Sequence, residues 1–385
     1  MFEYHADWLA NMARFSLEPA LTVGEGQFHP GAGRDMFGAI GDSAPDTWGR
    51  RLMQRAERRQ AHREKRAIRT LQETDYLLGV TDVARLGALR FKHTNDESFQ
   101  APLGQGVPGF LRLAELMASA DRIERGEETD EDLQTIFAPG SSLGGARPKA
   151  SVIDDAGALA IAKFPKETDD YSIETWERVA LQLASDAGIE TPRCDLRAIN
   201  GHAVLLSWRF DRVGETRIPF LSAMAMLQLK DGDRASYPEI VDEMARHSAQ
   251  AKLDTHQLYR RMVLNVLISN VDDHLRNHGF LWAGKTGWIL APAYDLNPTP
   301  TDLKKRILTT NISLDEGTCS LELAESQAEY FGLSLKDART IAAETAQAVQ
   351  NWRAVAARFG ESPQSIERMA SAFEHDDLRY GLRLA

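Results

Sequence analysis

The segment NVDDHLRNHGFLW, Asn270 to Trp282, constrains the fold of this chain most strongly, because a run of polar residues leads directly into an apolar stretch. Two aspartates, two asparagines and two histidines lie between Asn270 and His278, and Gly279 to Trp282 are apolar. Asn and Asp satisfy backbone groups in turns, so the segment is predicted to be an ordered loop followed by a strand. Taken alone, it is compatible with a purely structural loop.

A metal-dependent hydrolase is a second interpretation of the same segment. His274 and His278 are four residues apart and would share one face of a helix, as zinc ligands do. However, Leu275 replaces the glutamate that acts as general base in H-E-x-x-H, and no third ligand is obvious. The zinc interpretation is therefore the weaker one.

A third interpretation uses the spacing of Asp272 and Asn277, which form D-x-x-x-x-N as in the phosphotransfer loop of kinases. There the aspartate accepts the proton of the substrate hydroxyl, and the asparagine binds magnesium. A second metal-binding carboxylate is expected after a short strand, and Asp295 follows the apolar residues Trp288 to Ala291. One carboxylate and one amide oxygen, completed by nucleotide phosphates, suit Mg²⁺.

An upstream segment supplies candidates for phosphate binding. After the glycine-rich APGSSLGGARPKA, the segments SVI and ALAIAKF are predicted to form a hairpin. Leu159, Ile161 and Lys163 would share one face of its second strand. The following helix, Ile173 to Ala187, carries Glu177, which would hold Lys163 through an ion pair. GGARPK is not a Walker A loop, but the order of all these features favours phosphoryl transfer over coincidence.

Composition restricts the class of protein. A chain of 385 residues exceeds what one hydrophobic core usually serves, so two or more lobes are expected. The net charge of -11 opposes nucleic-acid binding by the whole surface, and the basic run Arg50 to Arg69 is predicted to be a solvated helix face. Two cysteines, no export signal and no membrane-spanning apolar run predict a cytoplasmic protein.

Six short segments together resemble one known family. They are DSAPDTWGRRL, SSLGGARPKA, IAKFP, WRFDR, NVDDHLRNHGFL and APAYDL, in this order along the chain. Their combination is specific, covers most of the chain, and is similar to the HipA-like serine/threonine kinases of bacterial toxin–antitoxin modules.

The resemblance implies a role for each matching residue. Asp272 would be the catalytic base, supported by His274, and Asn277 and Asp295 would bind Mg²⁺. The ATP-binding residues would be Gly144, Gly145, Ala146, Arg147, Pro148 and Lys149 of the phosphate loop, Lys163 with Glu177, the hinge residues Trp208, Arg209 and Phe210, and Tyr294. A serine of the glycine-rich loop can be autophosphorylated in this family, which silences the kinase; Ser142 is the best match and Ser141 the next.

The resemblance also predicts the architecture, an α+β fold with a small N-terminal domain and a two-lobed core similar to protein kinases. The N-terminal domain would span residues 1–135 and the kinase core residues 136–385. Within the core, residues 136–210 would form the β-rich nucleotide lobe, and residues 211–385 a large all-helical catalytic lobe. ATP and magnesium are expected to bind between the lobes.

Partners and substrate are likewise expectations from the family. A helix-turn-helix antitoxin of HipB type is the expected partner, with DNA contacted only through it and no membrane involved. Family members often carry extra strands before a segment like FEYHADWL, so a separate small protein is expected to supply them here, unless the open sheet edge is covered in another way. Characterised relatives phosphorylate aminoacyl-tRNA synthetases, which makes such an enzyme a candidate substrate. A catalytically silent regulator that binds an antitoxin repressor is the alternative.

Overall fold

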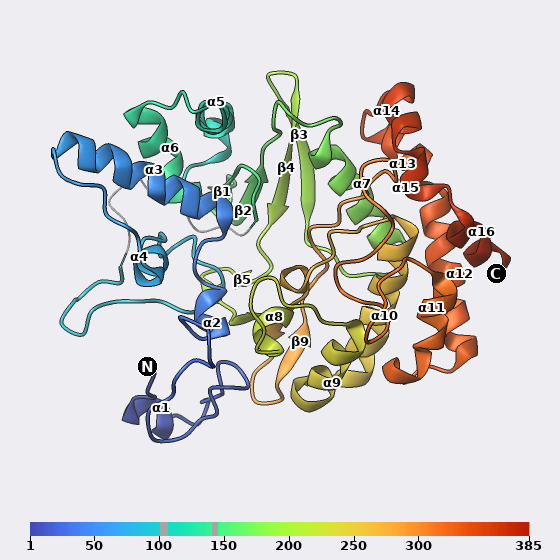
Figure 1. Cartoon of the computed structure of the whole chain (residues 1–385), viewed down its shortest axis with the longest axis horizontal. Coiled ribbons are helices and arrows are strands. Elements are labelled where there is room, and N and C mark those ends of the chain that lie inside the picture. Colours follow the sequence, from blue (N-terminus) through green and yellow to red (C-terminus); the bar gives the residue numbers. More distant parts are fainter. Residues whose placement is uncertain (101–106, 141–144, 385) are drawn as a thin grey trace. The chain divides into compact units, whose positions relative to one another are not determined.

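The computed structural model describes residues 1–100, 107–140 and 145–384. The chain forms two compact units, each assembled from segments that are distant in sequence. Unit 1 contains residues 1–28, 175–192 and 221–385, and unit 2 contains residues 29–174 and 193–220. Figure 1 gives the order of the elements along the chain.

Unit 2 combines helices with an antiparallel sheet. Its helices are α2 (Gly38–Gly41), α3 (Thr47–Arg63), α4 (Glu73–Leu78), η1 (Phe110–Arg112), α5 (Leu113–Arg125) and α6 (Asp130–Gly140). Its strands are β1 (Lys149–Ile153), β2 (Leu159–Lys163), β3 (Cys194–Ile199), β4 (His202–Trp208), β5 (Arg212–Val213) and β6 (Thr216–Arg217). Strands β1 to β4 form one sheet in the order β1-β2-β4-β3, and β5 pairs with β6.

The predicted hairpin is present as β1 and β2, and its register places Lys149 opposite Lys163. Leu159, Ile161 and Lys163 share one face of β2, as predicted, but this face is only half-buried. The fully buried face of β2 presents Ala160 and Ala162 instead. Small side chains on the core face allow helices to approach the sheet closely.

Residues on both sides of position 135 contribute to one hydrophobic core in unit 2. Trp48 and Leu52 of α3, Leu116 of α5 and Val152 of β1 all belong to it and are buried. Helix α6, in which the predicted boundary near residue 135 falls, packs against α3, α5 and β1. The boundary between an N-terminal domain and a kinase core therefore stays a prediction.

The basic run begins in α3, and most of its arginines are paired within unit 2. The pairs are Arg50–Glu73, Arg51–Glu124, Arg55–Glu128, Arg59–Asp130, Arg63–Asp130, Arg66–Glu57 and Arg69–Asp75. The acidic partners lie in α3, α4, α5, the segment before α6, and α6 itself. The positive charge of the run is thus largely balanced by neighbouring carboxylates.

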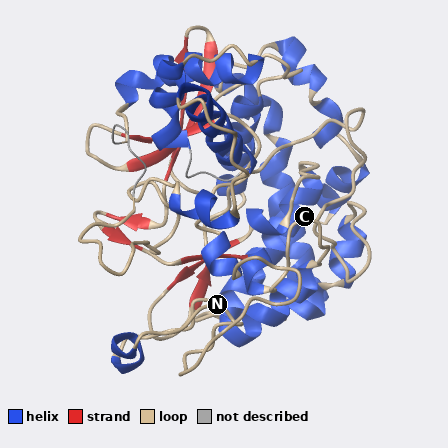
Figure 2. Ribbon diagram, turned by 60° about the vertical axis from the view of Figure 1, so that its left-hand side comes forward, coloured by secondary structure: helices blue, strands red, loops and turns tan. Residues whose placement is uncertain are grey.

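Helices predominate in unit 1. Figure 2 distinguishes the helices of the chain, in blue, from its strands, in red. The helices of unit 1 are α1 (Ala6–Ala10), α7 (Ile173–Asp186, whose first two residues belong to unit 2), α8 (Ala223–Met226), α9 (Tyr237–His247), α10 (Ala251–Leu267), η2 (Leu275–Asn277), α11 (Leu321–Ser326), η3 (Ala328–Phe331), α12 (Leu335–Gln350), α13 (Trp352–Arg358), α14 (Pro363–Arg368), α15 (Ala370–Phe373) and α16 (Asp376–Arg383). Helix α10 is the central element, because α9, α11, α12 and α16 all pack against it.

Unit 1 also contains a small sheet, so the large lobe is mainly rather than entirely helical. Its strands are β7 (Phe220–Ser222, whose first residue belongs to unit 2), β8 (Gly279–Trp282) and β9 (Trp288–Leu290), in the order β7-β8-β9. Strand β8 is the apolar end of the opening motif, and β9 matches the strand predicted before Asp295. No helix in the described ranges has both the length and the apolar character to span a membrane.

Candidate functional site

The predicted catalytic loop connects α10 to β8, and adjacent residues in it have opposite environments. Helix α10 ends at Leu267, and Ser269 then takes a left-handed backbone conformation with φ of 52°. The side chain of Asp272 is 59% exposed, whereas the side chain of Asp273 is only 2% exposed. The loop therefore presents one carboxylate to solvent and buries its neighbour.

Backbone and side-chain bonds fix the loop between Asp272 and Asn277. The amides of His274 and Asn277 donate to the carbonyls of Asp272 and His274 at 2.9 Å and 2.8 Å, respectively. The Asn277 side chain donates from Nδ2 to the Asp272 carbonyl at 3.1 Å. Because this bond uses the nitrogen, the amide oxygen Oδ1 is left to act as a ligand. The donor set of Asn277 thus fits Mg²⁺, which prefers oxygen ligands.

Strand pairing brings the segment before Asp295 to the catalytic loop. The amide of Ala291, just after β9, donates to the carbonyl of Gly279 in β8 at 2.8 Å. Further along, the Tyr294 hydroxyl donates to the carbonyl of Arg276 at 2.6 Å. Tyr294, predicted to bind the nucleotide, therefore also fastens the Asp295 segment to the loop.

Asp295 has a backbone conformation that few residues other than glycine adopt. Its φ is 58°, in the left-handed region. Such a conformation costs on the order of 1 kcal/mol for a residue with a Cβ atom, and it is concentrated at functional sites. A carboxylate held there at a cost supports the predicted role in metal binding.

The zinc interpretation of His274 and His278 does not match the local structure. Only Leu275–Asn277 are helical, as a 3₁₀ turn, and the two histidines flank it in extended conformations. They therefore do not share a helix face. His278 contacts the buried Asp273 at 3.0 Å instead. Among the described residues, no group of three or more His, Cys, Asp and Glu side chains is arranged to hold a metal ion.

Lys304 is a residue near the site that the sequence motifs did not identify. Its ammonium group lies 3.7 Å from Oδ1 of Asp272, and both side chains are 59% exposed. The basic run Lys304-Lys305-Arg306, shortly after Asp295, was the available signal. Solvent screens so exposed a pair, so Lys304 contributes a nearby positive charge rather than much stability.

In unit 2, the predicted phosphate loop enters β1. Gly145 has a φ of 86°, and its amide donates to Asp46 at 2.7 Å. The space beside its Cα is filled by the Lys149 side chain, because a Cβ added there would lie 2.6 Å from Nζ. The backbone conformation of Gly145 thus favours glycine, and the Lys149 ammonium group would have to shift to make room for a larger residue.

The remaining loop residues are tied to the start of α7 and to β2. The Arg147 guanidinium is ion-paired with Asp169 and Glu174, and the Ala146 carbonyl accepts from Lys166 at 3.5 Å. The carbonyl of Pro148 accepts from the amide of Phe164 at 3.0 Å. Arg147 is therefore engaged within the protein, which favours a structural role for this member of the predicted loop.

Lys149 and Lys163 concentrate positive charge at the end of the hairpin. They are paired across β1 and β2, and Lys149 is buried. Ammonium groups attract phosphate oxygens, so this pair of side chains agrees with the predicted nucleotide-phosphate site.

The predicted hinge, Trp208 to Phe210, makes several internal contacts. The amides of Trp208 and Arg209 donate to the carbonyls of Arg193 and Leu159, both at 2.9 Å. The Arg209 side chain forms an ion pair with buried Asp211, two residues further along the chain. The amides of Trp208 and Arg209 are therefore already used, and the hinge assignment stays a prediction.

Several predicted residues lie outside what can be described as one site. Ser141, Ser142 and Gly144 fall outside the described residues. Glu177 is buried in α7, within unit 1, whereas Lys163 belongs to unit 2. The predicted ion pair between Glu177 and Lys163 stays a prediction.

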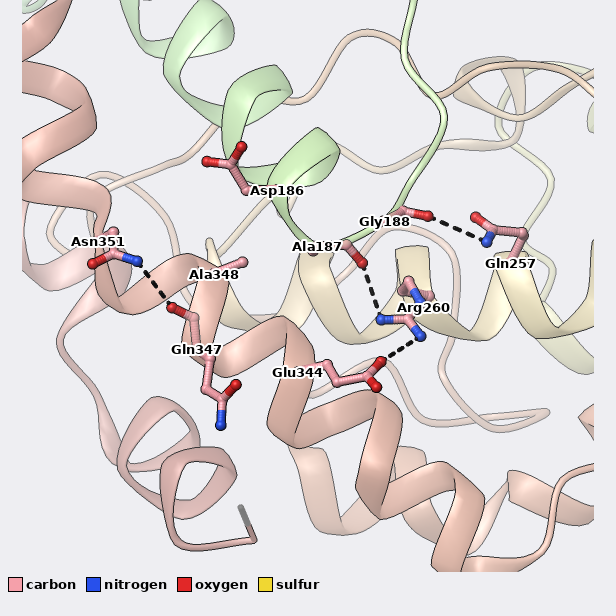
Figure 3. Close-up of a pocket in the computed structure, with 9 residues that line it drawn as sticks. All are labelled: Asp186, Ala187, Gly188, Gln257, Arg260, Glu344, Gln347, Ala348 and Asn351. Carbon is pink, nitrogen blue, oxygen red and sulfur yellow. Dashed lines mark hydrogen bonds and ion pairs between the residues drawn. The ribbon is translucent and has the colours of Figure 1, made fainter.

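A separate polar pocket of about 600 Å³ lies in unit 1 between the end of α7, α10 and α12 (Figure 3). Arg260 donates to the carbonyl of Ala187 at 3.0 Å and to Glu344 at 2.7 Å. Gln257 donates to the carbonyl of Gly188 at 3.3 Å. These contacts satisfy the end of α7, and none of the predicted site residues lines the pocket.

Comparisons with known proteins agree with this architecture. No curated protein matches the chain. A solved complex of HipA, HipB and operator DNA from a Shewanella oneidensis toxin–antitoxin system matches with a TM-score of 0.65 and 16% identity, over 99% of this chain and 90% of that chain. The Helicobacter pylori proinflammatory kinase CtkA matches with a TM-score of 0.45 and 15% identity, over 63% of this chain and 94% of that chain.

The first of these matches shows a shared fold, which confirms the predicted α+β class with its kinase-like core. The sequence profile of the HipA-like C-terminal domain matches residues 141–353, which is more than half of the chain. That range includes the predicted catalytic loop, Asp295 and the hairpin with Lys149 and Lys163. The chain therefore belongs to the family of proteins with a HipA-like C-terminal domain.

Proposed function

We propose that this protein is an ATP- and Mg²⁺-dependent serine/threonine protein kinase that acts in the cytoplasm as the toxin of a toxin–antitoxin module. The observation that carries the proposal is the arrangement in unit 1. An exposed Asp272 lies in a fixed loop with Asn277, and the Tyr294 hydroxyl fastens the strained Asp295 segment to that loop. These are the groups that phosphoryl transfer requires, in the required order.

Each residue then has a chemical role. Asp272 accepts the proton of a serine or threonine hydroxyl as that oxygen attacks the γ-phosphorus of ATP and the bond from phosphorus to the leaving ADP breaks. The Oδ1 atom of Asn277 and the carboxylate of Asp295 would hold Mg²⁺, which would neutralise charge on the phosphates. Lys304, close to Asp272, adds positive charge beside the reacting groups. Catalysis of this kind depends on positioning and electrostatics.

Unit 2 contributes the nucleotide-binding groups in this proposal. Lys149 and Lys163 face the same side of the hairpin, and their charge is suited to the phosphates of ATP. Gly145 keeps the loop close to Lys149. The hinge residues complete the nucleotide-binding part of this proposal, as the family resemblance implies.

The family supports further parts of the proposal. A HipB-type antitoxin is the proposed partner, because the matched HipA structure is a complex with HipB and operator DNA. An aminoacyl-tRNA synthetase is the proposed substrate. Autophosphorylation of Ser142, or of Ser141, is the proposed means of self-inhibition.

Transfer of labelled phosphate from ATP tests the proposal directly. The wild type is incubated with Mg²⁺ and cell lysate, and modified residues are mapped by mass spectrometry. Asp272→Asn is expected to reduce transfer by about 10²–10⁴-fold, as for loss of a positioned general base. Asp302→Asn is the matched control, since Asp302 is an exposed aspartate paired with Arg368.

The control is expected to keep full activity. A folded wild type that binds ATP but transfers no phosphate, to itself or to lysate proteins, would replace this proposal with the catalytically silent regulator. Equal transfer by wild type and Asp272→Asn would show that another residue is the base.

A further inference from the structure

A buried carboxylate lies directly beside the proposed base. Asp273 accepts a hydrogen bond from the Tyr237 hydroxyl through Oδ2, and its Oδ1 lies 3.0 Å from Nε2 of His278. Its carbonyl accepts from the amide and hydroxyl of Thr310 at 2.9 Å and 2.7 Å. Asp273 is thus held by α9, by the start of β8 and by a later loop.

The Tyr237 hydroxyl also forms a hydrogen bond with a residue of α10. It accepts from Nδ2 of Asn265 at 3.0 Å, and Oδ1 of Asn265 accepts from Nδ2 of Asn270 at 3.0 Å. All three side chains are at most 1% exposed. Burial, and then the charge of Asp273, raise the pKa of Tyr237 well above 10, so its hydroxyl stays protonated and donates to Asp273.

Further hydrogen bonds connect Asn270 to Asp295. Oδ1 of Asn270 accepts from the backbone amide of Asn297 at 3.1 Å. The Asn297 side chain donates from Nδ2 to the carbonyl of Asp295 at 3.1 Å and to its Oδ1 at 3.3 Å. These two bonds brace the residue that has the left-handed backbone.

An unbroken series of hydrogen bonds therefore joins Asp273, Tyr237, Asn265, Asn270, Asn297 and Asp295. We infer that the first five of these residues form a positioning network that fixes the Asp295 carboxylate relative to the catalytic loop, and so sets the affinity of the site for the divalent cation that accompanies the nucleotide. The inference rests on the proposed function and names residues that do not touch the substrate.

Two physical arguments support this role. Buried polar groups are costly unless every partner is present, so a network of this kind has one favoured arrangement. The bonds also connect a loop, two helices and the Asp295 segment, which no single strand or helix links. Partners of metal ligands typically change metal affinity or activity by 10–100-fold when removed.

Tyr237→Phe tests the network at its centre, because it removes only the hydroxyl that joins Asp273 to Asn265. Tyr259→Phe is the matched control: Tyr259 is also fully buried, lies on α10, and its hydroxyl has no hydrogen-bond partner among the described residues. Binding of Mn²⁺ with ATP, read from the electron paramagnetic resonance signal of free Mn²⁺, and binding of ATP alone, by calorimetry, are measured for each.

We expect Tyr237→Phe to weaken Mn²⁺ binding in the presence of ATP by at least about tenfold. ATP binding without metal should stay within twofold, because it does not depend on Asp295. Tyr259→Phe should match the wild type in both measurements. Equal loss of metal-free and metal-dependent binding would indicate general loosening of the fold and overturn the inference.

Asn297→Ala supplies a second test at the other end of the network, and remains available if Tyr237→Phe does not fold. It should weaken Mn²⁺ binding similarly. Residues that act through one network are not additive, so the double variant should lose little more than the worse single variant. Losses that multiply would show two independent effects and overturn the network.

Wild-type behaviour separates the two proposals. If the wild type binds Mn²⁺ with ATP but the Tyr237 and Asn297 variants bind it equally well, the network is wrong and the proposed function stands. If the wild type shows no metal-dependent nucleotide binding, the proposed function fails and the inference with it.

Discussion

Two neighbouring aspartates in the predicted catalytic loop differ in burial, and this difference separates their roles. Asp272 and Asp273 are adjacent in sequence, yet one is exposed beside Lys304 and the other is enclosed by Tyr237 and His278. An exposed carboxylate can meet a substrate, whereas the buried carboxylate accepts from Tyr237 and so holds α9 against the loop. The motif identifies the pair, but not which of the two neighbours is buried.

Asp211 is a second buried aspartate, in unit 2, and shows how strongly such a group can be held. It accepts from Arg209, from Arg212 at 2.7 Å and from the amide of Gly87 at 2.7 Å. Burial alone would raise the pKa of Asp211, but the charges of Arg209 and Arg212 keep it below its ordinary value. The carboxylate is therefore charged at neutral pH.

We expect Asp211→Asn to lower the free energy of unfolding by about 3–5 kcal/mol, because it leaves buried guanidinium groups without a counter-charge. Urea titration followed by tryptophan fluorescence measures this. Asp195→Asn is the control, since Asp195 pairs with Arg197 on a largely exposed part of β3 and should cost less than about 1 kcal/mol. Similar losses in both variants would contradict the buried-pair argument.

At the scale of elements, α16 begins with a histidine cap. Nδ1 of His375 accepts from the amide of Leu378 at 3.4 Å, and Nε2 lies 3.1 Å from the carbonyl of Leu267 at the end of α10. Burial, and then the charge of Arg306, lower the pKa of His375 to about 4 despite the opposing effect of Asp377. The neutral ring fits both contacts, because one nitrogen accepts and the other donates.

The stability that this neutral ring contributes should depend on pH. In the unfolded chain the imidazole gains a proton near pH 6.5, whereas in the folded chain it does so only near pH 4. Its contribution is complete above pH 6.5 and is lost as the pH falls toward 4, by on the order of 2 kcal/mol between pH 6.5 and 5.

His375→Asn keeps an accepting cap and removes the titration, so its unfolding free energy should fall less between these pH values than that of the wild type. Urea titrations at pH 6.5 and 5 measure the difference. A gap between wild type and variant that is the same at both pH values would exclude His375 as the titrating group.

Elements with strong local signals were predictable from the sequence. The hairpin β1–β2, helix α7 and strand β9 all match. Strand β3 was missed, because it is half-exposed and its sequence, CDLRAI, mixes charged and apolar residues. Pairing with β4, rather than its own pattern, makes it a strand.

The site was predictable only in part, because some of its residues are brought together by packing rather than by a local sequence pattern. Asp272, Asn277 and Asp295 follow a spacing that the sequence displays. Tyr237, Asn265 and Asn297 are remote from one another along the chain, and only the packing of α9 against α10 and the hairpin β8–β9 brings their polar atoms together. Such contacts leave no local pattern.

At the scale of the whole molecule, both the net charge of -11 and the pairing of the α3 arginines disfavour binding to nucleic acid. Arginines that already neutralise carboxylates release few counterions on meeting a phosphate backbone. The basic run therefore should not make the chain a DNA-binding protein by itself.

We expect the purified chain to bind duplex DNA at physiological salt no more tightly than non-specific binders do, with a Kd of about 10⁻⁴–10⁻⁶ M. Fluorescence anisotropy with labelled duplex measures this. Arg58→Glu, within α3, should change the Kd by less than twofold. Tight binding that Arg58→Glu abolishes would establish the helix as a nucleic-acid surface.

The left-handed backbone of Asp295 has a consequence for how such a chain changes over generations. Glycine is the residue that this conformation favours, so replacement by glycine would relax the fold while deleting the carboxylate. Most damaging changes to a protein are also disfavoured by its folding. At this position the backbone conformation itself favours loss of the carboxylate, and what opposes that loss is the bond from Asn297 to Oδ1 together with the chemistry that the carboxylate performs.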